Sequence, residues 1–86
     1  MSIIDKLMFK ILRGTCDNNI YFDDLVKLLS YFSFEERIKG DHHIFTRNDI
    51  EEIINLQPVG AKAKPYQVKQ VRNLIIRYKL GGGDNV

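Results

Sequence analysis

The sequence predicts an α+β domain in which a three-stranded antiparallel sheet packs against helices. Apolar residues recur at helical spacing near both ends of the chain, whereas apolar and polar residues alternate in the middle. A glycine-containing dipeptide separates two of the alternating runs, which is a hairpin signal. These observations predict helices before and after a sheet.

Three helices are expected. The first covers residues 2–12 and stops at Gly14, and the second covers residues 22–32. The third begins at Pro65, whose missing N–H does no harm in a first turn, and ends at the glycine run 81–83. The apolar stripes that should be buried are Ile4, Leu7, Met8, Ile11 and Leu12, then Phe22, Leu25, Leu28, Leu29 and Phe32, then Val68, Val71, Leu74, Ile75 and Tyr78.

Three strands are expected between the second and third helices. They cover residues 34–39, 42–47 and 53–57, with Gly40-Asp41 as the turn between the first two. In the first strand, Phe34 and Ile38 should share the buried side. The stretches 48–52 and 59–64 are interpreted as a polar connection and a flexible basic loop.

The 86 residues suffice for one domain. Because a three-stranded sheet must bury one face, the flanking helices should cover it in a layout of the double-stranded-RNA-binding-domain kind. We therefore expect a single domain over residues 1–86. It comprises an N-terminal helical extension (1–14), a core (21–80) and a frayed tail (81–86).

Charge is unevenly distributed along the chain. Residues 1–58 carry seven Lys or Arg against ten Asp or Glu, whereas residues 59–86 carry six Lys or Arg against Asp84 alone. A basic C-terminal third suits a polyanionic partner, although a solvated helix face would show the same pattern. Candidates for contacts to the phosphates of such a partner are Lys39, Lys62, Lys64, Lys69 and Arg72.

Secretion and membrane insertion are not indicated. Cys16 is the sole cysteine, so the chain cannot form an internal disulfide. Charged residues interrupt every apolar stretch before it reaches the length of a membrane span or a signal peptide. A cytoplasmic location is therefore expected.

Four segments within residues 22–80 form a pattern: Asp24-Leu25-Val26-Lys27-Leu28-Leu29, then Lys39-Gly40-Asp41-His42-His43-Ile44-Phe45, then Leu56-Gln57-Pro58, then the helix after Lys64-Pro65. The Gly-x-His-His-x-Phe run is the most specific part. In these segments the chain resembles the HicA toxin family. The resemblance implies an mRNA interferase of a type II toxin–antitoxin pair, with a fold related to the double-stranded-RNA-binding domain. It also implies activity without metal or small-molecule cofactor, inhibition by a HicB-type antitoxin, and His42 as the essential residue.

The chain departs from the family pattern at three places. Asp41 stands where relatives usually have Ser or Thr, and Val59-Gly60 stand where many have a second histidine. The helix at residues 2–12 lies outside the family core. The carboxylate of Asp41 would repel a phosphate, yet it could also hold an imidazolium.

RNA cleavage by a ribose 2′-hydroxyl needs a base, an acid and positive charge near the phosphate, and histidine suits both proton transfers near neutral pH. His42 follows a tight turn, which should hold its side chain rigidly in an exposed position. His42 and His43 should project to opposite faces of their strand, so we assign catalysis to His42. Gly40, Asp41 and His43 are assigned supporting roles.

Several alternatives remain open from the sequence. The chain could be a non-catalytic RNA-binding module, which Asp41 favours, or a subunit that only binds a protein partner. Asp41 and His43 could share a face and bind a metal, but no third ligand is evident. Cys16 has no neighbouring base in the sequence that would activate it. Core packing is expected, rather than base stacking, for the aromatic residues Tyr31, Phe34, Tyr66 and Tyr78.

Overall fold

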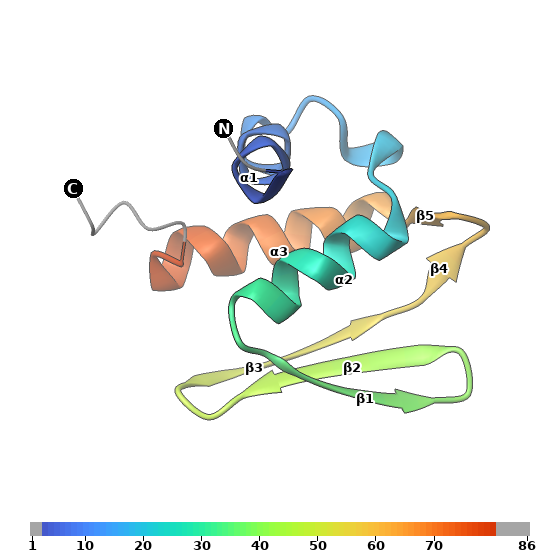
Figure 1. Ribbon diagram of the computed structural model, residues 1–86, viewed down its shortest axis with the longest axis vertical. Helices are drawn as coiled ribbons and strands as arrows, with labels where there is room; N and C mark the ends of the chain where they lie inside the picture. Colours follow the sequence, from blue (N-terminus) through green and yellow to red (C-terminus); the bar gives the residue numbers. More distant parts are fainter. Residues whose placement is uncertain (1–2, 81–86) are drawn as a thin grey trace.

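The computed structural model describes residues 3–80 as three layers (Figure 1). The three-stranded antiparallel sheet forms one layer, α2 and α3 form the second, and α1 lies across them on the far side from the sheet. The α+β class and the order of helices and sheet are thus as predicted. The helices are α1 (Ile3–Arg13), α2 (Phe22–Tyr31) and α3 (Pro65–Tyr78), with a short 3-10 helix η1 (Asp17–Asn19) between the first two.

The helix ends follow local backbone chemistry. Gly14 adopts a φ of 74° directly after α1, and Pro65 occupies the first turn of α3, both as predicted. The end of α3 differs from the prediction, since Lys79 rather than a glycine takes the left-handed conformation. Its turn is closed by the N–H of Leu80, which donates to the carbonyl of Ile75 at 3.0 Å. The glycines 81–83 and the tail expected at 81–86 lie outside the described residues.

The sheet has the strand order β1 (Glu35–Lys39), β2 (His42–Arg47) and β3 (Ile50–Leu56). Gly40 has a φ of 63° in the turn between β1 and β2, which confirms the hairpin. The third strand is longer than predicted, because Ile50 and Ile54 are both buried and residues 50–52 continue the alternation. The register of β2 against β3 shifts between Phe45 and Arg47, where the strand pair has a bulge.

The segment 59–64 is not the flexible loop that the sequence suggested. Pro58–Val59 (β4) and Lys62–Ala63 (β5) form a second small hairpin, with Gly60 at a φ of 61°. Main-chain hydrogen bonds hold the turn and β5: Phe22 N–H donates to Ala61 O at 3.0 Å, and Ala63 N–H donates to Ile20 O at 2.9 Å. Hydrogen bonds to the segment before α2 therefore order the basic stretch.

The core lies between the sheet and the helices. The predicted stripe of α2 is completely buried, whereas Tyr78 of α3 is half-buried and Leu12 of α1 is exposed. Ile38 is 60% exposed, contrary to the prediction, because β1 is an edge strand whose five residues are all exposed. The buried apolar residues are Leu7, Ile11, Ile20, Phe22, Leu25, Leu28, Leu29, Phe32, Phe34, Phe45, Ile50, Ile54, Leu56, Ala63, Val68, Val71, Leu74 and Ile75.

Arg72 joins α3 to the N-terminal segment. One guanidinium nitrogen lies 2.9 Å and 3.1 Å from the two carboxylate oxygens of Asp17 and donates to the carbonyl of Ile11 at 3.2 Å. The side chains are only 15% and 22% exposed, respectively, for Arg72 and Asp17. Arg72 therefore stabilises the packing of α1 and η1 on α3, and its guanidinium, which the sequence suggested for phosphate binding, is engaged within the protein.

The first prediction concerns this ion pair. Arg72→Ala should lower the free energy of unfolding by about 2 kcal/mol, since it removes hydrogen bonds between charged groups that are largely shielded from water. Urea denaturation measures the change. Lys69→Ala, on the exposed part of the same helix, is the matched control and should stay within about 0.5 kcal/mol of the wild type. Equal stability of the two variants would contradict the role given to Arg72.

Candidate functional site

The two histidines of β2 point to opposite faces of the sheet. Phe45 is completely buried and His43 lies on the same face, where its ring meets the ring of Phe22 edge-on at 4.8 Å. The Nδ1 of His43 donates to the Glu36 carboxylate at 2.6 Å. His42 lies on the other face and is exposed, as the alternation predicted. The two imidazoles therefore do not share one site.

The side chain of Asn55 orients the ring of His42. Its Oδ1 lies 3.1 Å from Nδ1 of His42, across the β2–β3 strand pair. An amide oxygen only accepts hydrogen bonds, so Nδ1 must be the donor. In the neutral ring, Nε2 consequently carries the lone pair and can accept a proton. This is the state that a general base requires.

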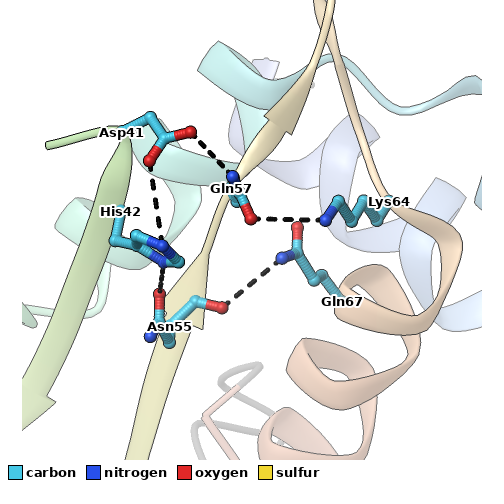
Figure 2. A network of polar contacts seen from close by, with 6 residues as sticks. All are labelled: Asp41, His42, Asn55, Gln57, Lys64 and Gln67. Atoms are coloured by element: carbon cyan, nitrogen blue, oxygen red, sulfur yellow. Dashed lines mark hydrogen bonds and ion pairs between the residues drawn. The ribbon is translucent and has the colours of Figure 1, made fainter.

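A chain of polar contacts continues from His42 to the start of α3 (Figure 2). Nε2 of His42 lies 3.8 Å from Oδ1 of Asp41, and the other oxygen of Asp41 accepts from Gln57 Nε2 at 2.7 Å. Lys64 Nζ donates to Gln57 Oε1 at 3.4 Å. The pKa of the Asp41 carboxyl lies below its ordinary value, chiefly because of the hydrogen bond from Gln57. Nearby His42 and Lys64 lower it further. A negative charge therefore persists beside His42 at neutral pH.

Gln67 connects α3 to the end of β3 beneath this chain. It is the buried polar residue of the core, at 1% exposure. Two orientations of its amide fit: in one, Nε2 donates to the carbonyl of Asn55 at 3.4 Å (Figure 2). In the other, the amide accepts from Gln57 N–H at 3.0 Å and donates to the Gln57 carbonyl at 3.2 Å. The second orientation is favoured because it pairs both ends of a buried amide.

The structure brings together only some of the predicted phosphate-binding residues. Lys39 is the cross-strand partner of His42 and shares its face, and Lys64 ends the polar chain described above. Lys69 is exposed on α3. Lys62 points elsewhere, since its Nζ donates to Asn19 Oδ1 at 2.6 Å and lies 5.6 Å from the centre of the Tyr21 ring. With Arg72 paired to Asp17, the predicted cations do not form one surface.

The sequence did not reveal the amide residues that surround His42. A hollow of about 290 Å³ is lined by His42, Ile53, Asn55, Gln57, Tyr66 and Gln70. Asparagine and glutamine carry no motif of their own. Asn55 reaches His42 from the position opposite Ile44, in a register that shifts further along the strand pair, between Phe45 and Arg47. A signal was available for the helix, because Tyr66 and Gln70 are spaced by one helical turn.

The expectation that these four aromatic residues, Tyr31, Phe34, Tyr66 and Tyr78, pack in the core is only partly correct. Phe34 is buried and Tyr78 is half-buried, with its hydroxyl donating to Glu52 at 2.5 Å. Tyr31 and Tyr66 are 64% and 63% exposed, contrary to the prediction. Tyr66 is therefore available at the edge of the His42 hollow.

No group of three or more His, Cys, Asp or Glu side chains in residues 3–80 is arranged to hold a metal ion. The side chains of Asp41 and His43, which the sequence suggested as metal ligands, have separate partners. Asp41 contacts His42 and Gln57, whereas His43 contacts Glu36. Cys16 lies in the segment before η1 and is half-buried.

Within the same described stretch, no helix has the length and apolar character needed to cross a membrane.

Comparison with protein-family models, with curated proteins and with solved structures found no significant match to this chain.

The second prediction concerns the proton on His42. When its ring is neutral, His42 should carry its proton on Nδ1 in the wild type, because Asn55 Oδ1 accepts a hydrogen bond there. Asn55→Ala removes the acceptor, so the ring should shift to a mixture of both tautomers. ¹⁵N chemical shifts of the ring nitrogens measure this, and His43 is an internal control because its bond to Glu36 is retained. A His42 spectrum that is the same in both proteins would disprove the role of Asn55.

Proposed function

We propose that the protein is a metal-independent endoribonuclease of the HicA toxin type, with a fold of the double-stranded-RNA-binding-domain kind. The observation that carries the proposal is the exposed His42, whose ring Asn55 holds with Nε2 free to accept a proton. The tight turn of Gly40-Asp41 places this ring at the start of β2. Lys39 is its cross-strand partner and lies on the same face of the sheet.

The proposed reaction needs one histidine and an RNA strand. Nε2 of His42 takes the proton of a ribose 2′-hydroxyl, and the 2′-oxygen forms a bond to the adjacent phosphorus. The bond from phosphorus to the 5′-oxygen breaks, and that oxygen receives the proton from the imidazolium. The products are a 2′,3′-cyclic phosphate and a 5′-hydroxyl end. Lys39 and Lys64 stabilise the negative charge that builds up on the phosphate oxygens.

Asp41 has two opposing effects in this scheme. Its ionised carboxylate stabilises the imidazolium that forms after the first proton transfer. It also repels the phosphate, and the hydrogen bond from Gln57 Nε2 partly offsets the negative charge on one carboxylate oxygen. The proposal includes a cytoplasmic setting and a HicB-type antitoxin that covers His42 and thereby blocks the substrate.

A second candidate function is RNA binding without cleavage. The negative charge of Asp41, 3.8 Å from Nε2 of His42, is the observation that favours it. Under this alternative the same surface binds RNA and no product is formed. The two functions differ in a single measurement, which is turnover of a bound RNA.

The third prediction tests His42 directly. His42→Ala should lower the rate of cleavage of a labelled single-stranded RNA by at least about 100-fold, which is the usual contribution of a general acid–base residue. It should also relieve the growth arrest that the wild type causes when it is expressed without an antitoxin. His43→Gln is the matched control: it keeps a hydrogen-bonding group for Glu36 and should retain activity within about three-fold. Full activity of His42→Ala, or loss of activity in His43→Gln alone, would refute the assignment.

The fourth prediction concerns the products and metal. Cleavage should continue in excess EDTA, because the internal hydroxyl is the nucleophile and His42 moves its proton. The downstream fragments should carry 5′-hydroxyl ends, which polynucleotide kinase labels without prior phosphatase treatment. Activity that EDTA abolishes and a divalent cation restores would show that a different mechanism operates.

A further inference from the structure

A stripe of polar and aromatic residues runs along α3 beside the His42 hollow. Tyr66, Gln70, Asn73 and Arg77 recur every three or four residues, so they share one side of the helix. With Glu52, Lys69 and Leu74 they line a second hollow of about 330 Å³. The two hollows share Tyr66 and Gln70 and therefore adjoin. Together they form a groove that leads from His42 along α3, which we call the α3 groove.

The α3 groove presents groups that suit nucleobases. Tyr66 is 63% exposed at the junction of the two hollows, where its ring can stack on a flat partner. In the part of the chain that the structure describes, the side chains of Tyr66, Gln70 and Asn73 have no hydrogen-bond partner. Their amides and hydroxyl are thus available to the edges of bases.

The charges of the groove also suit a nucleic acid. Its one acidic residue, Glu52, is engaged on both oxygens: Arg77 donates to one at 3.0 Å and the hydroxyl of Tyr78 donates to the other at 2.5 Å. The hydrogen bond from Tyr78 holds the pKa of Glu52 below its ordinary value, so the acid balances Arg77. Lys69 adds a positive charge at the rim.

We propose that the α3 groove binds a single RNA strand next to the cleaved phosphate, with one base stacked on Tyr66 and its neighbours against Gln70 and Asn73. This inference rests on the proposed function and assigns its substrate subsite. From Tyr66 to Arg77 the helix rises about 16 Å, enough for about five stacked nucleotides. Bases inside a duplex cannot reach Tyr66, so the groove selects unpaired RNA.

Binding of an RNA that cannot be cleaved tests the groove independently of catalysis. The probe is a fluorescent, fully 2′-O-methylated single strand of mixed sequence, titrated with each protein at fixed salt and followed by anisotropy. Tyr66→Ala should weaken binding by about ten-fold or more, because base–aromatic stacking is lost. Tyr66→Phe keeps the ring and should bind within about two-fold of the wild type.

Tyr31→Ala is the matched control. Tyr31 is 64% exposed on α2 and does not line either hollow, so its loss should leave affinity unchanged. A duplex of the same length should bind wild type and Tyr66→Ala equally. The proposal is overturned if Tyr66→Ala binds the single strand as tightly as the wild type does. It is also overturned if Tyr31→Ala loses as much affinity as Tyr66→Ala. The groove would then serve another partner.

The outcome is distinguishable from failure of the proposed function. If wild type binds the methylated strand through Tyr66 but cleaves no RNA, the subsite stands and the protein is a binding module. If it cleaves RNA through His42 while Tyr66→Ala binds normally, the nuclease stands and the subsite is wrong.

Discussion

The burial of Phe45 determines where the functional groups of this protein lie. Phe45 is completely buried, and the two-residue period of β2 then places His43 against Phe22 and His42 on the open face. A slip of one residue would expose Phe45, at a cost of about 2–3 kcal/mol, and would turn the ring of His42 towards the core. The register of one central strand thereby fixes both the packing and the exposure of the candidate catalytic histidine.

The orientation of His42 depends on a second, more distant contact set. Asn55 and Gln57 lie at the end of β3, and the buried amide of Gln67 pairs with the main chain of Gln57. α3 is thus tied to the strand end that carries both amides. Because an unpaired buried amide is costly, Gln67 holds the helix and strand in one relative position. The hydrogen bond that His42 Nδ1–H donates to Asn55 Oδ1 can then fix the tautomer of His42 without further support from the open face.

Local patterns predicted the helices, the first hairpin and the opposite directions of His42 and His43, because each depends on residues close in sequence. The amides near His42 were not predicted, because the contact of Asn55 with His42 depends on how β2 pairs with β3. That pairing has a register shift, and β3 begins at Ile50, earlier than the sequence suggested. The role of Arg72 was missed for a related reason. Its charge is neutralised by Asp17, which is 55 positions away in sequence, and counting charges along the chain cannot reveal such a pair.

The folded arrangement also changes what the basic C-terminal third can do. Arg72 pairs with Asp17, Arg77 pairs with Glu52, and Lys62 points towards Asn19, so much of the excess charge is used within the protein. Of the predicted phosphate-binding residues, Lys39, Lys64 and Lys69 remain for such contacts, from β1, from the residue before α3 and from α3. Three phosphate contacts on a single strand give a salt slope of only about two, which indicates modest electrostatic affinity. The proposed nuclease, with so few cations, needs a second source of binding energy. In the proposed α3 groove, base stacking on Tyr66 is that source, beside His42.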